Sequence, residues 1–318
     1  MNLRILIGKQ INERTIATTF KQYRARESSL APNFNRVDSE AFSGSAYKGD
    51  SYVSTTDASG TIGFELTKET LEDLLPAGGY ELTGSPTMTR TGFTFTDEAV
   101  ATSSGKIEEF YTIIEQNLED DEERIIIGAQ FSNMDIDVTK SQYALMNCDV
   151  LGYTMTYIDT INHTTFTTIS DFNSPITCTT ANLILNNNEI SLDTQSAVLS
   201  VNNNLENRFG LSSRDATKRV RNGFIEATLT VTASAYLKPQ FKEAWDAMLD
   251  GTSLPAILLL QDGYDSGDNV CALFIHNMKV NSPEMTDKSA SGGLNIEYDV
   301  LNDIVVGTPM SFAFGTID

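Results

Sequence analysis

The feature that most constrains the fold is a regular alternation of apolar and polar residues between positions 224 and 233. The run contains no proline, and the nearest glycine, Gly223, lies just before it. The alternating residues are Phe224, Ile225, Glu226, Ala227, Thr228, Leu229, Thr230, Val231, Thr232 and Ala233. A period of two with many β-branched residues predicts a β-strand that has one apolar face and one polar face.

A helix is expected shortly after this strand. Residues 241–249 have the spacing of an amphipathic helix, which Asp250 and Gly251 would end. Two apolar runs follow at 255–260 and 270–275, and both predict strands. The many Thr, Ser and Asn residues along the chain also favour strands and turns over helices.

The same order of elements occurs in the first half of the chain. A strand at 60–67 leads into a short helix at 68–75, with Thr67 as the expected N-cap. The spacing between related segments is that of a domain rather than of a solenoid repeat, so we interpret the pattern as an internal duplication. The matched segments are 2–6 with 182–185, 60–67 with 223–230, 112–116 with 257–261, 124–138 with 270–280 (Asn133-Met134 with Asn277-Met278), and Asp149-Val150-Leu151 with Asp299-Val300-Leu301.

The predicted fold class is therefore mainly β, with two tandem sandwich-like or barrel-like units that each carry one short flanking α-helix. The first unit spans residues 1–160 and includes an inserted loop at about 76–110, in which residues 92–96 suggest an extra hairpin. A polar linker follows at 161–180, and the second unit spans residues 181–318.

The charge balance argues against tight nucleic-acid binding. The 318 residues include 43 Asp and Glu against 22 Lys and Arg, which gives a net charge of −21. Phosphate binding requires clustered basic side chains, and an acidic surface repels DNA. We expect no membrane helix and no secretory leader. We expect Cys148, Cys178 and Cys271 to be reduced thiols.

The sequence shows no motif for catalysis, a cofactor or a metal. His163 and His276 have no partners at metal-ligand spacing. The acidic run 119–123 and the Asp- and Gly-rich run 262–268 are expected to form equivalent hairpin tips. Calcium binding by the first run is the alternative, although the spacing differs from that of an EF-hand. We therefore predict no enzyme activity, no cofactor and no metal site.

One basic cluster, Lys218, Arg219 and Arg221, stands out against the acidic chain. We interpret these residues as candidate inter-subunit contacts that meet an acidic patch on another copy, because opposite charges fix the register of an interface. The alternatives are a solvated face without a partner and a contact with nucleic acid.

Several segments of the second half carry a family resemblance through their order: 201–206, 210–215, 221–223, the strand at 227–232, the helix end at 249–251, the strand at 257–260, and the closing runs 277–285 and 293–300. This order resembles that of the tail tube proteins (major tail proteins) of long-tailed bacteriophages. The resemblance covers about residues 181–303 and reaches the first half through the internal match. It departs from the family in length, since many tube proteins hold one such unit.

The resemblance implies tail-tube-like β units that join side by side into a barrel, in rings that stack into a tube for DNA. Two units per chain then predict, by counting, a homotrimeric ring with pseudo-sixfold symmetry; six chains per ring is the alternative. The implied partners are other copies of the chain and other tail proteins: tape measure, tail terminator, and distal tail or sheath proteins. DNA would pass through an acidic lumen without tight binding, and no membrane takes part. The implied location is the virion tail, after synthesis and assembly in the cytoplasm of the host bacterium.

A rival hypothesis from another class is a two-domain β-sandwich protein of the virion surface that binds a receptor or a glycan. The single tryptophan, Trp245, lies on the predicted helix, where core packing is expected more than sugar stacking. A hydrolase with paired carboxylates is the weaker third hypothesis, because an acidic chain brings many carboxylates together by composition alone.

Overall fold

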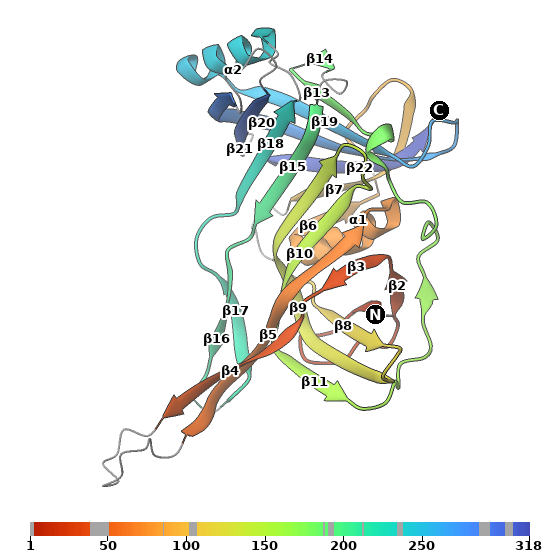
Figure 1. The fold of residues 1–318 in the computed structure, drawn as a ribbon, viewed down its shortest axis with the longest axis vertical. Helices are drawn as coiled ribbons and strands as arrows, with labels where there is room; N and C mark the ends of the chain where they lie inside the picture. The colour runs from red at the N-terminus through yellow and green to blue at the C-terminus, as the bar shows by residue number, and fades with distance from the viewer. Residues whose placement is uncertain are drawn as a thin grey trace.

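The computed structural model describes residues 3–38, 51–84, 86–101, 107–186, 188–189, 194–211, 213–233, 238–285, 293–302 and 308–318 (Figure 1). Within these residues the protein is mainly β, which confirms the predicted class. The helical elements are α1 (Lys68–Leu74), the 3-10 turn η1 (Leu75–Gly78), the 3-10 turn η2 (Cys178–Thr180) and α2 (Lys238–Asp250). The strands are β1 (Leu3–Lys9), β2 (Lys21–Tyr23), β3 (Ala25–Ser28), β4 (Ala31–Asp38), β5 (Ser51–Glu65), β6 (Tyr80–Thr83), β7 (Phe93–Ala101), β8 (Tyr111–Asn117), β9 (Glu122–Thr139), β10 (Leu145–Gly152), β11 (Thr154–Ile158), β12 (Thr167–Thr168), β13 (Asn182–Leu185), β14 (Asn188–Glu189), β15 (Thr194–Asn202), β16 (Leu205–Phe209), β17 (Ala216–Arg221), β18 (Glu226–Ala233), β19 (Leu254–Gln261), β20 (Asn269–Met285), β21 (Leu294–Val300) and β22 (Met310–Ile317).

One continuous antiparallel sheet, which we term the long sheet, runs along the molecule. Its strands, in order, are the second part of β20 (278–285), β21, β18, β15, the second part of β9 (133–139), β10, β5, and β4 with β3. Figure 1 shows these strands side by side, with β4 and β5 extending beyond the body of the protein. The long sheet therefore includes strands from both halves of the chain.

The long strands β9 and β20 each take part in a second layer. The first part of β9 pairs with β8 and β11, and β8 continues to β1 and β2. The first part of β20 pairs with β19 and β22; β19 continues to β13, and β22 continues to β7. Both strands contain pairing irregularities where they pass from one layer to the other, which is how bulges bend a strand.

The two helices follow equivalent strands of the long sheet. Helix α1 begins after β5, where the Thr67 hydroxyl accepts a hydrogen bond from the Thr70 amide at 3.1 Å, as predicted for an N-cap. Its apolar side chains Leu71 and Leu74 are fully buried. Helix α2 follows β18 and starts three residues earlier than the predicted position 241. Neither helix in the described part of the chain combines the length and apolar character needed to cross a membrane.

The pairing order is the same in the two halves. In the first half it runs β1–β8–β9–β10–β5–β3/β4, and in the second half it runs β13–β19–β20–β21–β18–β15. Val150 lies between Phe131 and Gly60, and Val300 lies between Met278 and Ala227. The Asp-Val-Leu segments therefore occupy equivalent places in the two halves.

The register corrects two of the sequence matches. Phe131, rather than Met134, is the counterpart of Met278, and Ala227, rather than Gly223, is the counterpart of Gly60. Bulges in β9 and β20 contribute to the first shift, because an extra residue changes the count along a strand without leaving a mark in the sequence. The pairings of β5 with β10 and of β18 with β21 contain no bulge, and the structure gives no local cause for the second shift.

The segment 76–110, expected mainly as a loop, carries η1 and the strands β6 and β7. Strand β7 pairs with β6 on one side and with β22, more than two hundred residues later, on the other. The segment 161–180, expected as a polar linker, is packed against the body. Ile169 and Ile176 are buried, and the Ile176 amide donates to the Leu66 carbonyl at 2.8 Å. Isolated apolar residues fix this segment, although its composition is that of a loop.

A single cluster of buried apolar side chains fills the space between the layers and contains residues of both halves. Phe64 and Met146 represent the first half, and Leu229 and Tyr298 the second. The two halves are therefore joined through a shared core as well as through the long sheet.

Candidate assembly surface

One face of the long sheet is open and polar. In β18, Ala227, Leu229, Val231 and Ala233 point into the core, whereas the threonines between them are only partly covered. The same alternation continues across β21, β15, β9 and β10. The partly covered residues of this polar face are Asn133, Asp135, Asp137, Asn147, Asp149, Ser196, Val198, Ser200, Thr228, Thr230, Thr232, Asn295, Glu297 and Asp299. The period-two prediction for residues 226–233 is confirmed, and the face it predicted extends over several strands.

Six neighbouring strands of the polar face carry carboxylates without basic side chains among them. The six strands β5, β10, β9 from residue 130 onwards, β15, β18 and β21 contain no lysine and no arginine. Hydroxyl groups hold some carboxylates in place: the Thr61 hydroxyl donates to Asp149 Oδ1 at 2.9 Å, and the Ser200 hydroxyl donates to Asp135 Oδ1. Partial burial, together with the neighbouring Glu297, raises the pKa of Asp299. Across these six strands the face is thus acidic and hydrogen-bonded. The neighbouring β20 adds one basic side chain to it, the exposed Lys279 opposite Asp299.

The two halves meet in the long sheet at the pairing of β9 with β15, which we term the internal joint. It is an antiparallel ladder from Asn133 opposite Asn202 to Thr139 opposite Ser196. On the core side, Met134 lies opposite Val201, and both side chains are buried. The internal joint therefore combines backbone pairing with a continuous apolar core.

Amide and backbone hydrogen bonds close the end of the internal joint. The buried Asn203 side chain donates to the Gly78 carbonyl at 3.0 Å and to the Phe131 carbonyl at 3.1 Å. Its backbone amide donates to the Ser132 carbonyl at 2.8 Å. These bonds fix the direction in which the chain leaves β15 toward β16.

The long sheet has two unpaired edges within the described residues. At one end, no other strand pairs with the outer side of β3 and β4. At the other end, residues 279–285 of β20 pair with β21 on one side, and no described strand covers the opposite side. Unpaired backbone groups at a sheet edge are sites where another strand can add.

The basic cluster lies on β17, in the two-stranded sheet that β17 forms with β16. Lys218 is exposed, whereas Arg219 points inward. The Arg219 guanidinium donates to the Gly128 carbonyl at 2.9 Å and lies 4.7 Å from the centre of the Tyr153 ring. Desolvation by burial lowers the pKa of Arg219 to about 10. Arg221 donates to the Asn203 carbonyl at 2.9 Å. Two of the three candidates thus use hydrogen-bond donors inside their own chain, and an inter-subunit role for the cluster stays a prediction.

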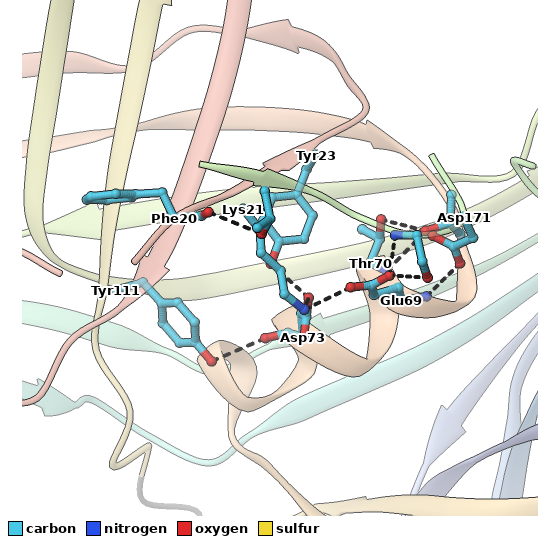
Figure 2. A network of polar contacts seen from close by, with 11 residues as sticks. Phe20, Lys21, Tyr23, Glu69, Thr70, Asp73, Tyr111 and Asp171 are labelled. Carbon is cyan, nitrogen blue, oxygen red and sulfur yellow. Dashed lines mark hydrogen bonds and ion pairs between the residues drawn. The ribbon is translucent and has the colours of Figure 1, made fainter. Parts of the chain in front are cut away.

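A polar network joins helix α1 to strand β2 and to the segment after β12 (Figure 2). Lys21 Nζ lies 2.8 Å from Glu69 Oε1 and 2.7 Å from Asp73 Oδ2. The Tyr23 hydroxyl donates to Asp73 Oδ2 at 3.0 Å, and Asp171 Oδ2 accepts from the Glu69 amide at 2.9 Å. We term these residues the α1 brace, because they tie three separate segments of the chain together.

Charges within the α1 brace stabilise one another. Burial alone would lower the pKa of Lys21, but the hydrogen bonds to Asp73 and Glu69 outweigh it and raise that pKa. Burial alone would raise the pKa of Glu69, but hydrogen bonds from Lys21 and Ser170 outweigh it and lower that pKa. Both shifts favour the ionised pair, so the brace is a structural contact.

The other singled-out residues take structural positions. Residues 119–121 lie in the turn between β8 and β9, and residues 262–268 lie between β19 and β20, as predicted for hairpin tips. His163 Nδ1 lies 2.8 Å from Glu123 Oε1, whose side chain is fully buried. His276 lies within β20 rather than at its end. No cluster of potential metal ligands occurs in the described parts of the chain.

Trp245 does not pack in the core as expected. It is 44% exposed and its ring is stacked on that of Phe241, with centroids 6.0 Å apart. Helix α2 instead buries Ala244 and Ala247, and the partly buried Phe241 and Met248 pack against the core beside them.

Comparison with known protein families gives an independent finding on this chain. A family model described as phage tail tube protein matches residues 2–259. This range includes the long-sheet strands of the first half and, from the second half, β15 and β18; β20 and β21 lie beyond it. The chain belongs to this family. It is therefore a structural protein of the virion tail, in a family whose members assemble into a tube. A comparison with curated proteins finds no match.

Sequence reasoning did not predict the extent of the polar face or the position of the two unpaired edges. The alternation in 226–233 indicated one polar face, but the neighbours of that strand come from distant segments. A signal was present: the strand-forming segments in question are acidic and lack lysine and arginine, although the chain as a whole carries 22 such residues.

Proposed function

We propose that this tail tube protein forms rings whose inner wall is the long sheet, with the polar face toward the lumen. The observation that supports this most is the acidic character of that face over the six strands β5, β10, β9, β15, β18 and β21, whose long-sheet residues include no lysine and no arginine. DNA that moves through the tube would meet carboxylates, hydroxyls and amides. None of these releases counterions from phosphate, so the DNA would slide without binding.

The repeated pairing order supports a ring of three chains with pseudo-sixfold symmetry. Each half contributes four strands to the long sheet: β3/β4, β5, β10 and β9 from one, and β15, β18, β21 and β20 from the other. We interpret these halves as products of a duplication, so that one chain does the work of two single-unit subunits. Six chains per ring is the alternative outcome.

The protein would act without catalysis, cofactor or metal. Its partners would be other copies of itself, the tape measure and tail terminator proteins, and distal tail or sheath proteins. Synthesis and assembly would take place in the cytoplasm of the host bacterium, before the tail joins the virion.

The lumen assignment is tested by changing the charge of the polar face. We expect Asp135→Lys with Asp137→Lys to form tubes that retain short double-stranded DNA, with retention that falls steeply as salt rises. Asp135→Asn with Asp137→Asn is the matched control and should form tubes with little retention. DNA retention would be measured by cosedimentation, with tubes verified by electron microscopy. Tubes of the lysine variant that leave DNA unbound at low salt would contradict a lumen position for this face.

A further inference from the structure

The internal joint shows how the second half of the chain pairs with the first. The two unpaired edges of the long sheet hold places equivalent to the two strands of that joint. We propose that a second copy of this chain adds its β3 and β4 edge to residues 279–285 of β20, in the register that the internal joint displays. This proposal rests on the proposed function, since it names the contact that would close the ring.

The first step is the equivalence of β9 and β20. Asn133 lies opposite Asp149, and Lys279 lies opposite Asp299, its counterpart in the second half. Met134 likewise corresponds to Val280, which lies opposite Tyr298. The side of β9 that β15 covers is thus the side of β20 that no described strand covers.

The second step is the equivalence of β15 with the β3 and β4 edge. Ser200 lies opposite Thr228 in β18, and Ser29 donates its backbone amide to the carbonyl of Thr61, the counterpart of Thr228. Residues 25–31 therefore hold the place in the first half that residues 197–202 hold in the second.

Combining the two steps gives a residue-by-residue register between copies. Val280 of one copy would lie opposite Leu30 of the next, as Met134 lies opposite Val201. Val280 and Leu30 are both buried on the core side of their strands, so the apolar core would continue across the contact. On the polar face, Ser282 would lie opposite Ser29.

The register also places two like charges together. Glu284 would face Glu27 of the neighbouring copy, where the internal joint has Asp137 opposite Val198. Both glutamates are exposed in the single chain. Like charges directly opposite each other weaken strand pairing, so the contact between copies should be weaker than the internal joint. Pro283, which has no backbone N–H, further limits the ladder.

Cysteine cross-linking tests the contact directly. Ser29→Cys with Ser282→Cys, in a Cys178→Ser background, should give a disulfide between copies, because opposed strand residues have suitable spacing. Cys148 and Cys271 are buried and need no change. Under mild oxidation of assembled tubes we expect covalent dimers and trimers in denaturing gels. Ser29→Cys with Asn295→Cys, one strand further away, is the matched control and should give few.

The outcomes separate this inference from the proposed function. Tubes in which the Ser29 and Ser282 pair gives no more cross-linking than the control would overturn the register and leave the tube function standing. Protein that forms neither tubes nor cross-links under any condition would overturn both.

A double-mutant cycle of charge reversals at Glu27 and Glu284 tests the same contact without depending on disulfide geometry. Glu284→Lys or Glu27→Lys alone should lower the protein concentration at which tubes form by about two- to fivefold, because each creates an opposite-charge pair. The double variant restores like charges and should return toward the original concentration. Additive effects of the two changes would contradict direct contact between these residues.

Discussion

The strands β9 and β20 occupy equivalent places in the two halves. They differ in the pairing of one edge: the edge of β9 that faces away from β10 pairs with β15, whereas no described strand pairs with the edge of β20 that faces away from β21. The part of β9 that forms the internal joint buries Met134, Ile136 and Val138 in the core. In β20 the equivalent stretch contains Lys279 and Pro283. Charged residues and proline are the means by which proteins keep a sheet edge from pairing indiscriminately. If a second copy adds at β20, Lys279 and Pro283 would keep this edge from pairing indiscriminately in the free subunit.

The insertion between α1 and β8 is a second difference between the halves. In the first half it supplies β7, which pairs with β22 of the second half and so joins the halves through the outer layer. The corresponding connection in the second half, from α2 to β19, is only 251–253. The two halves of one chain are therefore held together by the β7–β22 pairing as well as by the internal joint. The short connection 251–253 supplies no equivalent strand for the proposed contact between copies.

The largest expected effects come from placing a carboxylate on the core side of the internal joint, at Met134, or of the open edge of β20, at Val280. We expect Met134→Asp to lower the free energy of unfolding by about 4 kcal/mol or more, because it buries an unpaired charge between paired strands. Val280→Asp should cost less in the single chain, since one side of its strand is open, yet it should prevent ring formation. Urea unfolding and electron microscopy measure the two effects, with Met134→Leu and Val280→Ile as apolar controls. Equal losses of stability, or rings of Val280→Asp, would contradict the distinction.

A smaller loss of stability is expected when the contact between the β16–β17 hairpin and the rest of the protein is weakened. Arg219→Ala removes hydrogen bonds to Gly128, Gln130 and Asn207, and should lower the free energy of unfolding by about 2–3 kcal/mol. Lys218→Ala, at an exposed neighbouring position, should change it by less than about 0.5 kcal/mol.

The same variants also test whether the basic cluster of Lys218, Arg219 and Arg221 contacts another copy of the chain. If Lys218 contacts a neighbour, Lys218→Ala should raise the concentration needed for tube formation while leaving stability unchanged. Unchanged assembly of Lys218→Ala, and of the variant with Lys218, Arg219 and Arg221 all changed, would remove the cluster from the interface.

The smallest expected loss of stability from breaking a partly buried contact concerns the α1 brace of the first half. Lys21→Met should lower the free energy of unfolding by about 1 kcal/mol near neutral pH, because the Lys21 ammonium is partly exposed. The folded-state pKa of Glu69 is lowered, so its contribution is present above its ordinary pKa of about 4.3 and is lost as pH falls below it. The raised pKa of Lys21 means that its contribution is lost only as pH rises above about 10.4.

Urea unfolding of Lys21→Met and of the unchanged protein at a series of pH values checks this sign. The stability difference should be level between about pH 5 and pH 9 and should shrink in more acidic solution. A difference that grows as pH falls below 4 would show that the brace acts through something other than the ion pairs.

Local features of the fold were predictable from the sequence because they depend on neighbouring residues. The alternation in 226–233 gave the correct faces of β18, and Thr67 was correctly expected to cap α1. The Asp-Val-Leu segments were correctly matched as equivalent strand ends. Each of these rests on a period, a cap or a short identical run.

Features that depend on distant pairing were not predictable in this way. The alternating residues of β7 gave no indication that β22 would be its partner. Bulges displaced the matches around Asn133 and Asn277, since one added residue changes the register without changing composition. Trp245 was expected in the core because it lies on an amphipathic helix, but Ala244, Ala247, Phe241 and Met248 form the contact there.

The most direct test of the account is a density map of the assembled tube at a resolution that traces strands. We predict three chains per ring, β20 of each chain paired with β3 and β4 of the next, and Asp135 and Glu297 directed into the lumen. A ring of six chains, or a wall in which the polar face of the long sheet points outward, would contradict it.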